Sequence, residues 1–100
     1  MNGTGLTLAL IARIPHDGIG AFQAYESAVL PLLGDHGGVL QRRLAQSDNK
    51  IEIHLVWFPS AEHFARFRAD PRRGQHASML QSSGAVIELI EVGDMAVDPA

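Results

Sequence analysis

The chain has 100 residues, of which 46% are hydrophobic and 6% aromatic, and a formal net charge of −3 at pH 7. This length suits one domain, residues 1–100, with a largely aliphatic core, and the mild, mixed charge argues against nucleic acid as the main partner. The absence of cysteine excludes disulfides and thiolate metal sites. The apolar run 6–14 is too short to span a membrane and lacks a basic leader, so we expect a cytoplasmic protein.

The first half of the chain predicts a strand, a helix and a hairpin. In residues 6–14 both the odd-numbered and the even-numbered positions are mainly apolar, which is typical of a strand covered on two faces. From Ile19 the apolar period becomes helical, and Pro31 predicts a kink or a new first turn. Residues 39–46 and 51–58 predict two antiparallel strands joined by a tight turn.

A two-residue turn at 48–49 would fix how these two strands pair. One face would then pair Leu40 with Trp57, Arg42 with Leu55 and Leu44 with Ile53. The other face would pair Gln41 with Val56, Arg43 with His54 and Ala45 with Glu52. We expect the first, more apolar face to lie under the helices.

The second half predicts two more helices and a last strand. Ser60 is a good N-cap for a helix over 61–69, whose inner side carries Phe64, Phe67 and Arg68. Asp70-Pro71 starts another helix that should run to about residue 81, with Arg72 and Arg73 solvated or at an interface. A strand over 85–92 follows, and residues 93–100 predict a tail or an edge segment exchanged with a partner.

This order predicts an α+β, ferredoxin-like βαββαβ fold, with a four-stranded antiparallel sheet, helices on one face and an ordered core of about residues 6–93. The uncovered sheet face would be too apolar for water, so two such faces should pack together in a homodimer that forms an α+β barrel. The residues expected on that face are Thr7, Ala9, Ile11, Val39, Val56 and Phe58, with the polar dimer-face candidates Gln41, Arg43, Glu52 and His54 around them. That polar cluster predicts either an inter-subunit salt-bridge network or a site for an acidic ligand.

Five short segments resemble those of a known family: Tyr25-Glu26, Pro31-Leu32-Leu33, His36-Gly37-Gly38, Phe58-Pro59-Ser60 and Asp70-Pro71-Arg72-Arg73. The chain resembles a small, largely uncharacterised family of dimeric α+β barrel proteins related to the antibiotic-biosynthesis monooxygenases. The resemblance implies ferredoxin-like protomers, a homodimer whose sheets form a barrel, and a small-molecule pocket between sheet and helices. It also implies a range of activities: cofactor-independent oxygenation of polycyclic aromatics, haem degradation and plain ligand binding.

Glu26 is the candidate catalytic residue. It lies within the apolar helical stripe, and a carboxylate there either has a buried partner or faces a pocket, where it could act as a general base or anchor a ligand. A slightly rotated helix that pairs Glu26 with an arginine is the alternative. The neighbouring Tyr25 is a ligand-binding candidate that could supply a hydroxyl, or it packs in the core.

Trp57 and His76 are the other ligand-binding candidates. Their spacing is similar to that of a strand tryptophan and a haem-ligating helical histidine in the haem-degrading relatives, which makes haem the one cofactor considered. Those relatives also use an asparagine on the first strand, where this chain has Ile11-Ala12-Arg13, so a core tryptophan and a surface histidine are the competing interpretation. The five histidines form no metal-ligand motif, and we expect no metal site.

Three functions therefore stay open. The leading one is a homodimer that binds a small molecule in a pocket walled by Glu26, Trp57 and the helix bearing His76. The second is a cofactor-independent or haem-dependent oxidoreductase of monooxygenase type. The third is a purely structural dimer, whose interior would be filled by Phe22, Phe64 and Phe67.

Overall fold

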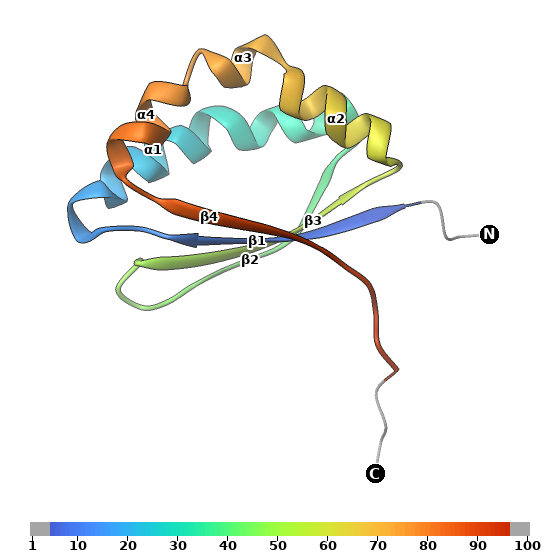
Figure 1. Ribbon diagram of the computed structural model, residues 1–100, viewed down its shortest axis with the longest axis horizontal. Coiled ribbons are helices and arrows are strands. Elements are labelled where there is room, and N and C mark those ends of the chain that lie inside the picture. Colours follow the sequence, from blue (N-terminus) through green and yellow to red (C-terminus); the bar gives the residue numbers. More distant parts are fainter. Residues whose placement is uncertain (1–4, 97–100) are drawn as a thin grey trace.

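The computed structural model describes residues 5–96, which form one four-stranded sheet with all of its helices on one side (Figure 1). The strands are β1 (Leu6–Arg13), β2 (Val39–Ala45), β3 (Ile51–Phe58) and β4 (Val86–Val92). They lie in the order β2-β3-β1-β4, and every neighbouring pair is antiparallel. This is the predicted α+β ferredoxin-like fold. No helix within the described residues is long and apolar enough to cross a membrane.

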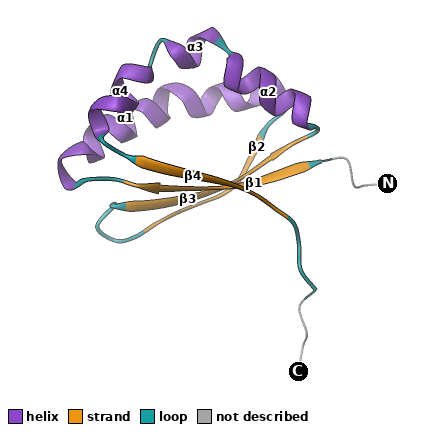
Figure 2. Ribbon diagram, in the orientation of Figure 1, coloured by secondary structure: helices purple, strands orange, loops and turns teal. Residues whose placement is uncertain are grey.

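The helical layer is built from several short segments (Figure 2). The α-helices are α1 (Ile19–Val29), α2 (Ala61–Ala69), α3 (Pro71–Gly74) and α4 (Ala77–Ser83), with 3₁₀ helices η1 (His16–Gly18) and η2 (Leu30–His36). The predicted change at Pro31 is observed: α1 gives way to η2 one residue earlier, because a proline cannot donate the backbone hydrogen bond that would continue the α-helix. Gly37 ends η2 at a φ of 74°, a conformation that glycine adopts without strain.

The helix predicted over 71–81 is two helices. Asp70 caps it as expected, since its side chain accepts a hydrogen bond from the Arg72 amide at 2.9 Å. The helix stops at Gly74, whose helix propensity is low, and α4 begins only after His76. The prediction of a cap at Ser60 is confirmed, because its hydroxyl oxygen accepts from the His63 amide at 3.2 Å.

The hairpin register is confirmed near its turn and wrong beyond it. Asn49 adopts a φ of 61°, and the observed pairs include Arg43 with His54 and Ala45 with Glu52, as predicted. A bulge between Leu40 and Arg42 then shifts the register. Leu40 therefore faces Val56 and Val39 faces Trp57, because the bulge adds one residue to β2.

The prediction of which sheet face lies under the helices is wrong. The even-numbered residues of β3 are the buried ones, so Val56 and Phe58 face the helices, and so do Arg43, Glu52 and His54. Both faces of β3 carry apolar residues, so strand alternation alone does not say which is covered. The even-numbered face is covered because α1 brings Glu26 to meet its polar residues.

The opposite sheet face is apolar and has no cover within the described residues, as expected from Thr7, Ala9 and Ile11. Val39 is 49% exposed and Ile90 is 42% exposed. We call this side the open face; it also carries Leu44, Ile53, Leu55, Trp57, Val86 and Val92. Residues 93–96 form no helix or strand, and the rest of the predicted tail lies outside the described residues.

Candidate functional site

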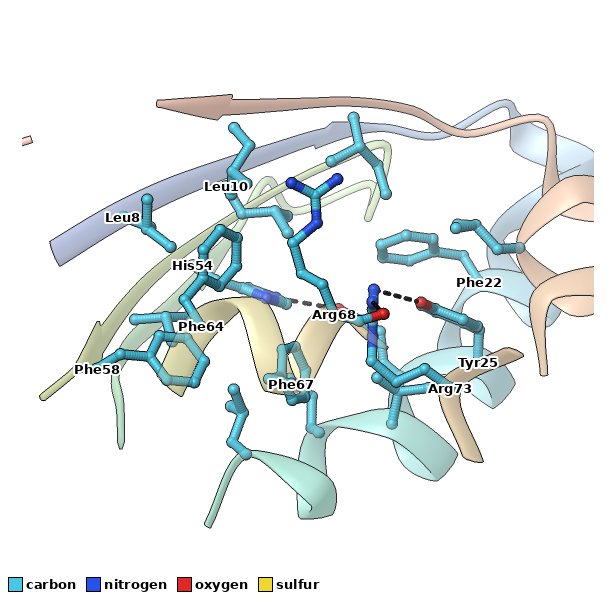
Figure 3. Close-up of a pocket in the computed structure, with 18 residues that line it drawn as sticks. Leu8, Leu10, Phe22, Tyr25, His54, Phe58, Phe64, Phe67, Arg68 and Arg73 are labelled. Atoms are coloured by element: carbon cyan, nitrogen blue, oxygen red, sulfur yellow. Dashed lines mark hydrogen bonds and ion pairs between the residues drawn. The ribbon is translucent and has the colours of Figure 1, made fainter. Parts of the chain in front are cut away.

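A cavity of about 290 Å³ lies between the sheet and the helices (Figure 3). Its walls are mostly apolar, as in typical small-molecule sites. Ile87 and Leu89 of the edge strand β4 line it and are also 37% and 42% exposed, so the cavity opens to solvent along this edge. The remaining walls include Leu8, Leu10, Phe22, Val56, Phe58, Phe64 and Phe67, with the polar residues Tyr25, Glu26, His54, Arg68 and Arg73.

Glu26 and His54, which line the cavity, belong to a charge cluster with Glu52 and Arg43, and all of its members except the half-exposed Arg43 are buried. The Nε2 atom of His54 lies 2.9 Å from Oε1 of Glu52 and 3.0 Å from Oε2 of Glu26. The Arg43 guanidinium reaches in from β2, 2.8 Å from Oε1 of Glu26 and 3.3 Å from Oε1 of Glu52. Both carboxylates therefore face cations, as buried charges require.

The contacts within the cluster favour the protonated form of His54. Burial by itself lowers the pKa of His54, but the hydrogen bonds to Glu26 and Glu52 outweigh it, and the net pKa is raised. Burial likewise raises the pKa of the Glu52 carboxyl, yet the hydrogen bonds with His54 and Glu26 and the charge of Arg43 lower it overall. An imidazolium beside ionised Glu52 is the favoured arrangement.

The two carboxylate oxygens of Glu26 have different partners. Its Oε2 atom is buried and lies 3.0 Å from Nε2 of His54 as an ion pair, but no described residue donates a well-aligned hydrogen bond to it. The Nε2 atom of His54 meets hydrogen-bond geometry with Oε1 of Glu52 instead. Because Glu26 lines the cavity, its carboxylate is the candidate acceptor for a hydrogen bond or a proton from a bound molecule.

The same residues could also hold a cation. One donor atom each from Glu26, Glu52 and His54 lies within 4.8 Å of the others, a mixed carboxylate and imidazole set that suits Zn²⁺. A metal would have to displace the His54 proton, and Arg43 already offsets part of the negative charge. The sequence signal for this group is the i, i+2 spacing of Glu52 and His54, which puts both on one face of a strand.

The structure brings together only some of the predicted site residues. Tyr25 and Glu26 line the cavity, whereas Trp57 lies on the open face and His76 precedes α4 without reaching the cavity. The dimer-face candidate Gln41 is the exposed bulge residue of β2. Arg43, Glu52 and His54, predicted for the open face, belong to the charge cluster under the helices.

Arg68 and Arg73 at the cavity were not predicted as site residues. Arg68 did appear on the inner side of its helix, which was a usable signal. Arg73 was expected to be solvated or at an interface, because it lies in the first turn of a helix, where its charge opposes the helix dipole. The helix ends at Gly74, and Nη2 of Arg73, near its end, lies 3.2 Å from the hydroxyl oxygen of Tyr25.

A second polar cluster ties α3 to η2, away from the cavity. Asp70 accepts from Arg72 at 2.7 Å and lies 2.8 Å from Nε2 of His36, while Arg72 also meets Asp35 at 2.9 Å. These hydrogen bonds, chiefly those from Arg72, hold the pKa of the Asp70 carboxyl well below its usual range. In this cluster Asp70 caps α3 and Arg72 links α3 to Asp35 of η2, so we assign the cluster a structural role.

Comparison with known proteins gives a fold and no closer relationship. No family model matches the chain, and no curated protein matches it. Among solved structures, SnoaB, a cofactor-independent oxygenase from Streptomyces nogalater, superposes with a TM-score of 0.78 at 16% identity, over 98% of this chain and 100% of that one. A candidate antibiotic biosynthesis monooxygenase from Nitrosomonas europaea gives 0.78 at 10% identity, over 95% and 94% of the two chains. Rv0793 from Mycobacterium tuberculosis gives 0.70 at 11% identity, over 94% and 100%.

Proposed function

We propose that this chain, which has the ferredoxin-like fold of the antibiotic-biosynthesis monooxygenase-like proteins, binds a small, largely apolar molecule in the cavity beneath its helices. The observation that supports this most is the cavity itself, which stays open although Phe22, Phe64 and Phe67 line it. A purely structural dimer would fill that space with these rings, since protein interiors are close-packed. The buried carboxylate of Glu26 gives the largely apolar site a polar anchor.

Binding can be tested with N-phenyl-1-naphthylamine, a neutral dye that fluoresces in apolar surroundings. We expect saturable binding to the wild-type protein. Leu89→Trp should weaken it by roughly tenfold, because the added ring fills the cavity mouth. The matched control is Met95→Trp, since Met95 is 86% exposed and lies beyond β4.

Equal binding by wild type and Leu89→Trp would contradict the proposal. It would mean that the dye binds the open face instead of the cavity.

The homodimer is part of this proposal. The apolar side chains of the open face are its support, because monomeric proteins rarely leave such a continuous apolar surface in water. A second copy of the chain would cover these side chains by packing sheet against sheet, on the face of the sheet opposite the cavity.

The second candidate is a monooxygenase-type enzyme that needs no cofactor. Two observations favour it: the fold is shared with SnoaB, described as a cofactor-independent oxygenase, and Glu26 is a buried carboxylate that lines the cavity. Removal of a proton from a hydroxylated aromatic substrate leaves an electron-rich anion that dioxygen oxidises more readily. In this interpretation Glu26 is the proton acceptor and His54 holds it in place.

Oxygen consumption with hydroxylated polycyclic aromatic compounds tests the enzyme candidate. Turnover by the wild type should fall by about 100-fold or more in Glu26→Gln, the range typical of a lost general base. Glu62→Gln, on the exposed side of α2, is the control and should leave turnover unchanged. An unchanged rate in Glu26→Gln would remove Glu26 from this role.

A haem-dependent enzyme has less support, because Trp57 and His76 do not lie in one site. Titration of the protein with haem should give no Soret shift that depends on His76. A shift that disappears in His76→Ala would reverse this view.

A further inference from the structure

The cavity has a second charged wall, formed by Arg68 and Arg73. Arg13, Arg43, Arg66 and Arg72 each lie next to a carboxylate, but no carboxylate of residues 5–96 pairs with Arg68 or Arg73. Instead the two guanidinium groups lie over aromatic rings, Arg68 5.5 Å from the centroid of Phe64 and Arg73 4.8 Å from that of Phe67. Figure 3 shows both side chains at the cavity.

Arg73 holds an unused buried donor. Its Nη2 donates to the Tyr25 hydroxyl at 3.2 Å and its Nη1 donates to the backbone oxygen of Arg68 at 3.1 Å. Its Nε is buried and has no hydrogen-bond partner in the described part of the chain. A buried donor without a partner is destabilising by itself, and an anion that pairs with it is strongly favoured.

Tyr25 adds a second donor beside the first. Its hydroxyl oxygen accepts from Arg73, and we find no acceptor for its own proton among residues 5–96. The Nε–H of Arg73 and the O–H of Tyr25 can therefore both donate to one ligand oxygen or carboxylate.

The charge balance of the cavity favours an anion. The one carboxylate of residues 5–96 that lines the cavity, Glu26, lies against Arg43 and His54, 2.8 Å and 3.0 Å away. The charge left uncompensated is that of Arg68 and Arg73. The cavity as a whole is therefore a small apolar chamber with excess positive charge on its helical side.

We propose that the cavity selects a small aromatic or aliphatic acid, with its carboxylate on Arg73 and Tyr25 and its apolar body against Phe22, Leu8 and Leu10. This rests on the proposed binding function and specifies the ligand class for the same cavity. Arg68 adds to the positive electrostatic potential of the cavity without contacting the ligand directly.

The test compares two ligands of nearly the same shape and different charge, naphthalene-2-carboxylate and the neutral naphthalene-2-carboxamide, by isothermal titration calorimetry at pH 7.5. We expect the wild type to bind the acid about tenfold or more tightly than the amide, with the preference shrinking as sodium chloride is raised. Arg73→Met keeps an apolar side chain over Phe67, so it should weaken the acid alone and leave the amide unchanged. Tyr25→Phe, which removes a single hydroxyl, should reduce the acid preference as well and serves if Arg73→Met fails to fold.

Arg42→Met is the matched control, because Arg42 also has no carboxylate partner in the described residues but lies on the open face, paired with Leu55. It should leave the acid preference intact. Equal affinity for acid and amide in the wild type, or a preference that survives in Arg73→Met or disappears in Arg42→Met, would overturn the acid selectivity and leave the binding function standing. Failure of the wild type to bind either ligand, together with no dye binding, would overturn both.

Discussion

The Nε2 atom of His54, on a central strand, lies 3.0 Å from Oε2 of Glu26, on the first helix. This contact joins the two layers of the fold at the wall of the cavity. His54 is 3% exposed and Glu26 is 4% exposed at the side chain, so the pair is screened from water and sensitive to its state of protonation. The charge cluster is thus both a structural tie and the polar end of the candidate site.

Stability should depend on pH through His54. Because its pKa is raised above the ordinary 6.5, its contribution to the free energy of unfolding is fully present below pH 6.5 and is lost as the pH rises through the folded-state pKa. Urea unfolding of the wild type should show this loss as the pH rises above 6.5, and His54→Gln should show a flatter profile there. A wild-type stability that rises or stays level above pH 6.5 would contradict the assignment of the proton to His54.

Glu52 should produce the opposite trend in acid. Its pKa is lowered from the usual 4.5, so its contribution is present above that pH and is lost as the pH falls through the folded-state value. Glu52→Gln should therefore be less stable than the wild type at neutral pH, and the difference should shrink below pH 4.5. Chemical denaturation at several acidic pH values measures this difference in stability, and a difference that stays constant would contradict the prediction.

The open face should make the protein a dimer. Trp57 is the single tryptophan and lies on this face, so its fluorescence reports whether the face is covered. We expect a blue-shifted emission that moves to longer wavelength on dilution, in step with a fall in sedimentation from dimer to monomer. A monomer at every concentration, with constant red emission, is the result that contradicts a dimer.

A charge placed on this face should break the dimer. Ile53→Glu buries an unpaired carboxylate in the proposed interface, at a cost of about 3 kcal/mol or more, which is roughly 100-fold in dissociation constant. Glu62→Lys, on the exposed surface of α2, makes a larger change of charge away from the proposed interface and should leave the sedimentation unchanged.

Two glycines offer a matched test of packing around η1. A Cβ added to Gly18 would lie 1.8 Å from the backbone oxygen of Ser83, so Gly18→Ala should force α4 away and lower the free energy of unfolding by about 2 kcal/mol. Gly20, two residues later in α1, has open space at its Cβ position. Gly20→Ala should stabilise by about 0.5–1 kcal/mol, because alanine is the better helix former. Thermal denaturation of both variants measures the contrast, and equal effects would contradict the close approach.

The N-cap of α2 can be tested in the same way. Ser60→Ala removes the oxygen that accepts from the His63 amide, and we expect a loss of about 1 kcal/mol. Ser82→Ala is the control, since that hydroxyl donates to the Met79 carbonyl on an exposed helix and should cost little. An effect of Ser82→Ala as large as that of Ser60→Ala would argue against the cap.

The sequence by itself determined the local structure. The caps at Ser60 and Asp70, the change at Pro31 and the turn at Asn49 follow from backbone chemistry within a few residues, and each is found where the sequence predicts it. The antiparallel pairing near that turn followed as well, because a tight turn fixes the register of its two strands. The placement of Glu26 in an apolar stripe likewise predicted a buried carboxylate.

Only the tertiary structure decided which face of the sheet the helices cover. Residues 51–58 are apolar at several positions of both parities, so alternation allowed either answer, and the one-residue bulge at Gln41 could not be read from the turn. The face was decided by long-range contacts: Glu26 and Arg43 compensate the charges of Glu52 and His54, which lets polar residues lie under the helices and leaves Trp57 and its neighbours outside. Apart from Tyr25 and Glu26, the site was beyond sequence reasoning for the same reason, since its charges come from five separate elements (α1, β2, β3, α2 and α3) that meet only when the layers pack.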